Sequence, residues 1–251
     1  QNGCFFRDDS SIIGITYGGS EFADYDNDGD FDLIITGLEL TNGFITLLYD
    51  NQNGQFVQNP SDFQGVSRST IAWADIDNDG DFDFVVGGQE GGISQTKTKM
   101  YKNESGNFVE VALPDSVLAQ VGLPSFDWGD FDNDGDVDLL LTGQIGLLAT
   151  RITSILRNEG NFVFTALNDE LVPVRTGDAK WADYDNDGDL DVAICGTDTS
   201  NTFGTYITRI YKNNLNVSNN APSQPQITSA VVNTSDVTLN WLPVMDDHTP
   251  Q

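Results

Sequence analysis

The sequence predicts an all-β fold in which one four-stranded unit is repeated along the chain. A nine-residue string with aspartate at every second position occurs four times, as "DYDNDGDFD" from residue 24, "DIDNDGDFD" from 75, "DFDNDGDVD" from 130 and "DYDNDGDLD" from 183. The copies follow one another at steps of 51, 55 and 53 residues. The segments between them show short apolar or alternating runs separated by turn residues, and none shows a sustained helical stripe.

Each copy contains the same four predicted strands in the same order. The first strand precedes the string and ends in an aromatic residue, which is Phe22, Trp73, Trp128 or Trp181. The second follows the string as "LIIT", "FVVG", "LLLT" or "VAIC", and the third alternates, as in "FITLLYDN" and "TKTKMYKN". The fourth begins at a glycine turn and carries Phe5, Phe56, Phe108 or Phe162. Tandem four-stranded units of this length are typical of β-propeller blades, so we expect the aromatic residues to pack between blades.

The repeat also sets the predicted domain boundaries. The propeller repeats are assigned to residues 1–213, with a single strand at 1–12 and units around 20–69, 70–124, 125–177 and 178–213. Residues 214–225 read "NLNVSNNAPSQP", which is polar and rich in Asn, Ser and Pro, as in a linker. Residues 226–251 begin with two alternating segments around a turn, which predict two further strands.

The string has the residue types and spacing of a cation-binding loop. Positions 1, 3, 5 and 9 are aspartate in all four copies, position 6 is glycine, and position 7 is an aspartate expected to offer its backbone carbonyl. Hard oxygen ligands on alternate residues around a glycine turn suit Ca²⁺, so we predict about four ions, one for each repeat. The predicted metal residues are Asp24, Asp26, Asp28, Asp30, Asp32, Asp75, Asp77, Asp79, Asp81, Asp83, Asp130, Asp132, Asp134, Asp136, Asp138, Asp183, Asp185, Asp187, Asp189 and Asp191.

Three other interpretations of the string are weaker. An EF-hand needs a bidentate glutamate at position 12, where this chain has Ile35, Val86, Leu141 and Ile194. Magnesium demands stricter octahedral geometry and retains more water. A solvated acidic turn without metal does not account for four copies that agree at every aspartate and glycine.

The segments "DYDNDGDFDLIITG", "DIDNDGDFDFVVGG", "DFDNDGDVDLLLTG" and "DYDNDGDLDVAICG" resemble the FG-GAP/VCBS repeats of integrin-α-like β-propellers. This resemblance covers residues 1 to about 213. It implies a propeller, usually of seven blades, with one calcium ion in the loop of each blade that carries the motif. The segments "APSQPQITSA" and "VTLNWLPVMDD" resemble the opening of a fibronectin type III domain, which places Trp241 at that family's core tryptophan position.

Only four copies are visible, which leaves two interpretations of the ring. The strand at 1–12 could complete the fourth unit and close a four-bladed ring, or the four repeats could be part of a larger propeller. The second is favoured because related propellers usually have more blades. Cys4 and Cys195 are predicted to lie on strands separated by one other strand, at a distance of about 10 Å that is beyond disulfide reach. We therefore predict two free, largely buried thiols.

The composition excludes several classes of function. The formal net charge is −28, and the chain has 11 Lys and Arg against 39 Asp and Glu, so it lacks the basic patch that nucleic acid requires. There is no apolar run long enough to insert into a membrane. The only histidine is His248, and no Ser/His/Asp or Cys/His set is evident, so we expect no enzymatic activity.

The expected function is that of a calcium-stabilised extracellular interaction or adhesion module, either secreted or on the cell surface. In an antiparallel meander the aspartate loops and the loops between second and third strands lie at opposite faces. We expect a protein partner (an adhesin, a receptor or secretion and surface machinery) to bind the latter loops, where Leu147, Leu148 and Phe203 are candidate contacts. The alternatives are a carbohydrate-binding, lectin-like propeller and a non-catalytic domain of a secreted enzyme. The sequons at Asn103 and Asn216 are compatible with an extracellular location.

Overall fold

The computed structural model describes residues 12–91, 95–112, 121–145, 150–167, 170–198, 204–214, 227–232 and 237–241. Within these ranges the chain forms seventeen β-strands and no helix, which confirms the all-β prediction. The strands are β1 (Thr16–Ala23), β2 (Asp32–Glu39), β3 (Gly43–Asn51), β4 (Phe56–Gln58), β5 (Ser67–Ala74), β6 (Asp83–Gln89), β7 (Thr96–Glu104), β8 (Asn107–Val111), β9 (Val121–Gly129), β10 (Asp138–Ile145), β11 (Thr150–Asn158), β12 (Phe164–Ala166), β13 (Arg175–Ala182), β14 (Asp191–Thr197), β15 (Tyr206–Tyr211), β16 (Ile227–Val232) and β17 (Val237–Trp241).

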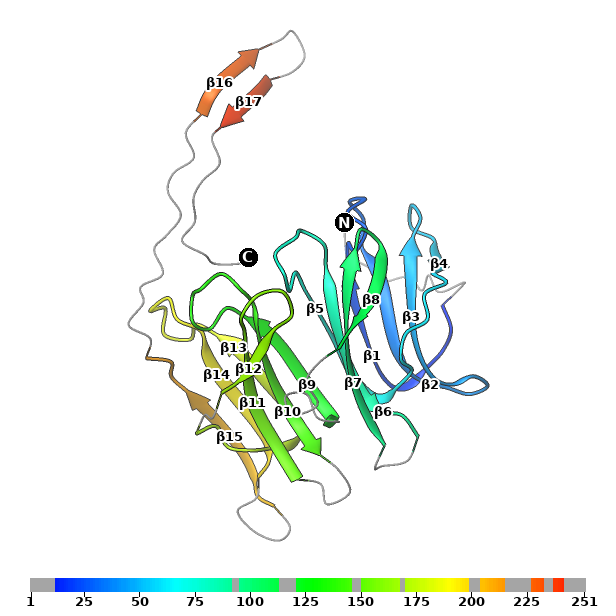
Figure 1. Ribbon diagram of the computed structural model, residues 1–251, viewed down its shortest axis with the longest axis vertical. Coiled ribbons are helices and arrows are strands. Elements are labelled where there is room, and N and C mark those ends of the chain that lie inside the picture. The colour runs from blue at the N-terminus through cyan, green and yellow to red at the C-terminus, as the bar shows by residue number, and fades with distance from the viewer. Residues whose placement is uncertain are drawn as a thin grey trace, which may run out of the picture.

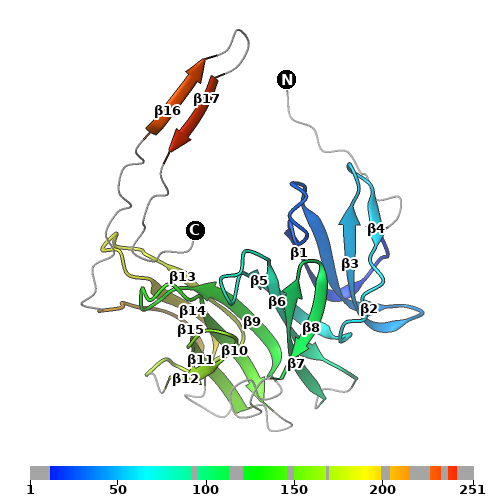
Figure 2. The ribbon, with the colours of Figure 1, turned by 45° about the horizontal axis from the view of Figure 1, so that its top comes forward.

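The first fifteen strands form four antiparallel meanders that are the blades of a β-propeller. Blade 1 is β1–β4, blade 2 is β5–β8, blade 3 is β9–β12, and blade 4 contains β13–β15. The first strands of successive blades contact one another in the order β1, β5, β9, β13, so the blades fan out around one side (Figures 1 and 2). In the described part of the chain β13 does not pack against β1. The described parts of the four blades therefore form an open arc (Figure 2).

In blades 2 and 3 the second strand is buried on both faces because a neighbouring blade covers each side. Every residue of β6 is buried, and β10 is buried up to its last residue. This explains why the second strands read as continuous apolar runs in the sequence, without the alternation of a half-exposed strand. The fourth strands, at the outer rim, are short and largely exposed.

Three apolar cores lie between consecutive blades. Between blades 1 and 2, Ile34 and Leu48 face a cluster of aromatic rings in which Phe63 stands edge-on to Phe84, with 5.1 Å between ring centroids. Fully burying side chains of this size contributes about 1.5–3 kcal/mol each. The predicted packing of the aromatic column between blades holds for Trp73, Trp128 and Trp181, which are half-buried against these cores.

Two predictions about individual residues have different outcomes. Cys195 is a free thiol, as predicted, but the prediction that it is buried is wrong, because no described residue of another blade covers its face of β14. Cys4 lies outside the described residues, as do Leu147, Leu148, Phe203 and His248.

The last two strands form a separate two-stranded sheet. β16 and β17 pair as an antiparallel hairpin that stands clear of the blades (Figure 1). Trp241 is 61% exposed there. The fibronectin type III domain stays a prediction. Within the described residues no helix is long and apolar enough to cross a membrane.

Candidate metal centres

Each aspartate string forms the loop between the first and second strands of a blade. In the first loop Asn27 at position 4 and Gly29 at position 6 have φ angles of 59° and 97°. Asparagine and glycine tolerate this left-handed region better than other residues do. The same two positions are left-handed in the other three loops, at Asn78 and Gly80, Asn133 and Gly135, and Asn186 and Gly188.

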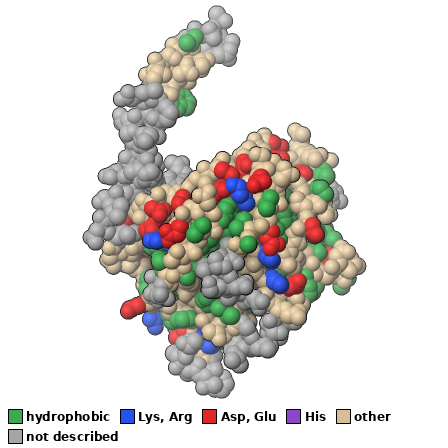
Figure 3. Space-filling view, viewed as in Figure 1, with side chains coloured by type: hydrophobic (Ala, Val, Ile, Leu, Met, Phe, Trp, Pro, Cys, Tyr) green, Lys and Arg blue, Asp and Glu red, His purple; other side chains and the backbone are tan. Residues whose placement is uncertain are grey.

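The loop brings three of the predicted carboxylates together. Ligand oxygens of positions 1, 3 and 9 lie within 4.8 Å of one another in every blade, and the groups are Asp24, Asp26 and Asp32; Asp75, Asp77 and Asp83; Asp130, Asp132 and Asp138; and Asp183, Asp185 and Asp191. Position 5 is not in these groups. Its Oδ1 instead accepts the backbone N–H of position 7, as Asp28 does from Asp30 at 3.0 Å. Acidic side chains gather in separate clusters on the surface, with Lys or Arg beside them (Figure 3).

Backbone amides hold the first and last carboxylates in place. In the third loop Asp130 accepts the amides of Asp134 and Gly135, both at 3.0 Å. Asp138 accepts the amide of Phe131 at 3.1 Å and that of Asn158, at the end of β11, at 2.8 Å. Position 9 is thus tied to both its own loop and the third strand. The same pairs of bonds recur in the other three loops.

Burial makes the position-9 carboxylates costly to ionise without a counter-ion. These side chains are at most 2% exposed in all four blades. Burial raises the pKa of Asp32 to about 6, that of Asp83 to about 7 and that of Asp138 to about 8. A bound cation would favour the ionised form and lower these pKa values again.

The residues present fit a hard divalent cation. All donors in the four groups are carboxylate oxygens, the ligand type that Ca²⁺ prefers. Two of them, Oδ1 of Asp77 and Oδ1 of Asp132, are buried and have no hydrogen-bond partner. A buried unpaired carboxylate oxygen costs several kcal/mol, and a coordinated ion would satisfy it. Asp77 and Asp132 occupy position 3, which supports a role for that position in coordination.

A lysine near the end of β7 and one just after β15 enter two of the four loops. Lys102 contacts Asp77 and lies 3.1 Å from Asp79, and Lys212 contacts Asp185 and lies 2.8 Å from Asp187. In blade 1 the corresponding residue is Asp50, whose carboxylate accepts a hydrogen bond from Tyr25. The second and fourth loops therefore carry an internal positive charge that competes with a bound cation.

Replacing Lys102 by glutamine is expected to raise the affinity of the second loop for Ca²⁺ by about three- to tenfold. The substitution removes a charge that a metal ion must displace or repel, worth about 1 kcal/mol at a partly exposed position. Isothermal titration calorimetry of the intact chain would measure the change. Lys99→Gln is the matched control, because Lys99 pairs with Glu110 away from the loops. Equal calcium affinity in both variants would contradict the assignment of Lys102 as a competitor.

Asparagine side chains connect neighbouring loops, which sequence reasoning missed. The Asn at position 4 donates to the Asp at position 7 of the next loop, from Asn27 to Asp81 at 2.8 Å and from Asn78 to Asp136 at 2.7 Å. The third link joins Asn133 and Asp189 at 3.1 Å. At these three junctions the position-7 side chain therefore receives a hydrogen bond from the preceding blade. Position 4 is asparagine in all four copies, and this repetition could have indicated a structural role.

A second set of asparagines lies at the ends of the third strands. Asn103 is fully buried and donates to the carbonyls of Phe82 in its own loop and Tyr25 in the preceding loop. Asn158 bonds in the same way to Val137 and Ile76. The sequon at Asn103 is therefore inaccessible to glycosylation in the folded protein.

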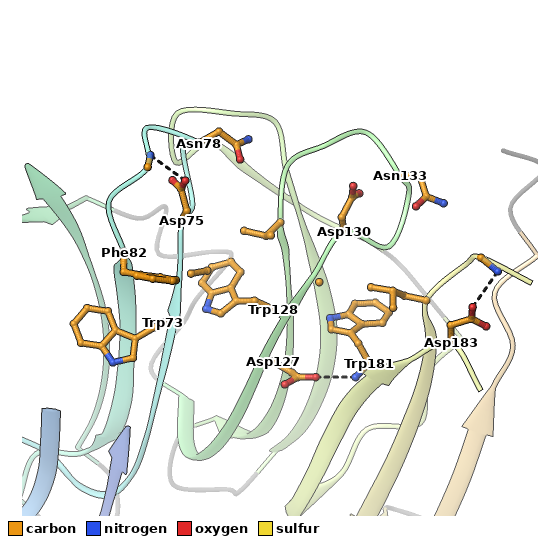
Figure 4. A pocket seen from close by; sticks show the side chains of 16 residues that line it. Trp73, Asp75, Asn78, Phe82, Asp127, Trp128, Asp130, Asn133, Trp181 and Asp183 are labelled. Atoms are coloured by element: carbon orange, nitrogen blue, oxygen red, sulfur yellow. Dashed lines mark hydrogen bonds between the residues drawn. The ribbon is translucent and has the colours of Figure 1, made fainter. Parts of the chain in front are cut away.

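A pocket of about 790 Å³ opens beside the second, third and fourth loops. Trp73, Trp128 and Trp181 line it side by side at the ends of β5, β9 and β13 (Figure 4). The first aspartate of each of these loops also reaches its wall. Asp127 links two blades at its base, because its carboxylate accepts hydrogen bonds from the backbone N–H of Trp181 and from Lys180, both at 2.7 Å.

Comparison with known protein families gives a match within the first two repeats. A family model described as an FG-GAP-like repeat matches residues 24–86, which include the first two aspartate loops and the strands between them. No curated protein matches the chain. FG-GAP-like repeats are typical of β-propeller modules of extracellular, adhesion-type proteins. The matched segment covers the first and second aspartate groups.

Proposed function

We propose that this chain is a non-catalytic, calcium-stabilised extracellular interaction module, secreted or displayed on the cell surface. The partner is a protein, such as an adhesin, a receptor or a component of surface machinery, and it binds the loops opposite the aspartate loops. The FG-GAP-like match and the four carboxylate groups, two of which contain a buried oxygen without a hydrogen-bond partner, support this proposal. Calcium is abundant outside cells, and loops of this kind bind it at the concentrations found there.

The main observation for the proposed binding face is the loop between β2 and β3. Leu40 at its tip is 96% exposed, and it lies at the end of β2 opposite the aspartate loop. The loop is held rigid by Glu39, whose carboxylate accepts hydrogen bonds from the Thr41 hydroxyl at 2.7 Å and from the Thr41 and Asn42 amides at 2.8 and 2.5 Å. A rigid loop that presents an apolar side chain loses little entropy on binding.

The test compares binding of the intact chain and its Leu40→Asp variant to surface proteins of the source organism, in calcium and in a chelator. Leu40→Asp is expected to reduce binding by about tenfold or more, as truncation of a central apolar contact does. Val109→Asp, at an exposed position of the rim strand β8, is the matched control and should bind like the original chain. Binding that withstands both Leu40→Asp and chelation would contradict the proposal.

A second candidate function is carbohydrate binding in the tryptophan pocket. The apolar faces of sugar rings pack against indole rings, and ligand pockets combine aromatic walls with a few polar groups. The three half-buried tryptophans and the nearby carboxylates provide this combination. This candidate places the binding site on the face of the aspartate loops, away from Leu40, so the two candidates are separable.

A glycan array with the intact chain tests the second candidate. Any bound glycan should lose affinity in Trp128→Ala and also in Gly129→Ala. Gly129 lines the pocket, and a methyl group there would lie 2.7 Å from a Leu190 methyl carbon and 2.9 Å from the Trp181 ring. The residue just before the aspartate string is alanine in the other three repeats, so the fold should accept alanine at position 129. Array binding that is unaffected by both variants would exclude the pocket.

A further inference from the structure

One residue beside each aspartate loop differs in charge from blade to blade. Near the end of each third strand an asparagine donates its backbone N–H to the position-9 aspartate of its loop, at 2.7–2.8 Å in all four blades. The residue before this asparagine, which we call the flanking residue, is therefore placed at the same point beside each loop. It is Asp50 in blade 1, Lys102 in blade 2, Arg157 in blade 3 and Lys212 in blade 4.

In blades 2 and 4 the flanking residue is a lysine that contacts the predicted metal ligands. Lys102 contacts Asp77 at position 3 and lies 3.1 Å from Asp79 at position 5. Lys212 makes the same two contacts in the fourth loop. A cation that enters either loop must displace the ammonium group or bind beside it. Oδ1 of Asp77 is still buried without a hydrogen-bond partner, so the lysine lowers the affinity of the loop for a cation and does not abolish it.

In blade 1 the flanking residue has the opposite charge. Oδ1 of Asp50 accepts hydrogen bonds from the Tyr25 hydroxyl at 2.7 Å and from the Asn59 side chain at 3.0 Å. Because Tyr25 is position 2 of the first loop, these bonds hold the Asp50 carboxylate at the loop. Asp50 is close enough to Asp26 for the two carboxylates to repel each other. The first loop thus has an additional negative charge where the second has a positive one, and this charge favours a bound cation.

In blade 3 the flanking residue is an arginine whose charge is partly offset. The guanidinium of Arg157 donates to the carboxylate of Glu159 from Nε at 2.9 Å and from Nη2 at 2.5 Å. This ion pair engages the guanidinium and compensates its charge. Arg157 still attracts Asp132, the position-3 ligand of the third loop. We therefore expect the third loop to bind a cation less tightly than the first loop and more tightly than the second and fourth.

The charge of the flanking residue is large enough to rank the loops. One unit of charge beside a partly exposed site changes the affinity for a cation by about three- to tenfold. Asp50 and Lys102 differ by two units, so the affinities of the first and second loops should differ by about tenfold or more. Physiological salt screens exposed charges beyond about 8 Å. Each flanking residue therefore acts mainly on the loop that it contacts.

We propose that the flanking residue sets the calcium affinity of each loop, so that the loop of blade 1 fills first, that of blade 3 second, and those of blades 2 and 4 last. The inference rests on the proposed calcium binding and assigns an order to it. The four strings agree at every predicted ligand position, so the strings themselves do not predict this order. As the calcium concentration falls, the two loops that contain a lysine empty first, and their ammonium groups then neutralise part of the carboxylate charge.

A calcium titration of the intact chain, isotopically labelled at glycine and followed by NMR, resolves the four loops. The position-6 glycine of every loop donates its backbone N–H to the position-1 aspartate at 3.0–3.1 Å. Each glycine signal therefore reports on its own loop, and the four are those of Gly29, Gly80, Gly135 and Gly188. We expect the midpoint of Gly29 at the lowest calcium concentration and that of Gly135 next. The midpoints of Gly80 and Gly188 should lie about tenfold or more above that of Gly29.

Two substitutions change the charge of the flanking residue in opposite directions. Lys102→Asp should lower the midpoint of Gly80 by about tenfold or more, a gain in affinity that loss of structure would not produce. Asp50→Asn should raise the midpoint of Gly29 by about three- to tenfold, and it keeps a side-chain oxygen that can accept the Tyr25 hydroxyl. Each substitution should leave the midpoints of the other three loops within about twofold.

Lys97→Asp is the matched control, because it makes the same change of charge at the other end of β7, where Lys97 pairs with Glu90 at 3.8 Å. It should shift no midpoint by more than about twofold. Equal midpoints for the four glycines, or midpoints that Lys102→Asp and Asp50→Asn leave unchanged, would overturn the order of filling and leave the proposed calcium binding intact. Four glycine signals that do not respond to millimolar calcium would overturn the proposed calcium binding and the order with it.

Discussion

Removing calcium is expected to lower the melting temperature of this protein by about 10 to 20 °C. Extracellular calcium loops commonly bind with a Kd of about 0.1–1 mM. At ten times the Kd each loop gains about 1.4 kcal/mol from mass action, so four loops gain about 6 kcal/mol. For a domain of this size 1 kcal/mol corresponds to about 2–4 °C. Differential scanning calorimetry with and without a chelator would measure the shift.

Removing calcium destabilises the protein because the carboxylates in each loop then repel one another. Three aspartates in each loop hold oxygens within 4.8 Å of one another, and one of the three is nearly inaccessible to water. Magnesium at the same concentration and ionic strength is the control, and it should restore only a small part of the loss because it resists dehydration. An unchanged melting temperature after chelation, with no heat of calcium binding, would refute the assignment.

The blade architecture could be predicted from the sequence because the repeat aligns each element four times. The continuous apolar runs of β2, β6 and β10 indicated strands covered on both sides, and the structure confirms them. The exposure of Cys195 could not be predicted in this way. It depends on whether another blade covers β14, which is a property of the arrangement of blades and not of the strand's own pattern.

The sequence predicted the position of the candidate metal loops but not the separate roles of the aspartates within each loop. Alternation and a glycine turn identified the loops, but spacing alone treats positions 3 and 5 alike. The structure distinguishes them, since Oδ1 of Asp132 is buried and unpaired whereas Asp134 accepts the amide of Asp136 at 3.0 Å. The roles of Asn78 and Asn158 also depend on contacts with neighbouring blades, more than 50 residues away in the chain.

Replacing Asp138 by asparagine should destabilise the protein by about 3 kcal/mol in calcium and by much less in a chelator. In calcium the variant loses a charged ligand, and one of the two amides that Asp138 accepts, those of Phe131 and Asn158, is left unpaired. Asp136→Asn is the matched control, because that residue's side chain lies outside the carboxylate group and its backbone is unchanged. Chemical denaturation of both variants under both conditions would give the four free energies.

The dependence on pH separates the metal role of Asp138 from a purely structural one. Without metal, burial raises its pKa to about 8, well above the value of an unfolded aspartate. The contribution of such a group to stability is fully present below the unfolded pKa and is lost as the pH rises through 8.

In a chelator the original chain therefore bears the cost of an ionised Asp138 at pH 9, whereas the asparagine variant does not. The variant's deficit should shrink from pH 6 to pH 9 in the chelator and remain large at both pH values in calcium. An equal deficit under all four conditions would mean that Asp138 serves only as a hydrogen-bond acceptor.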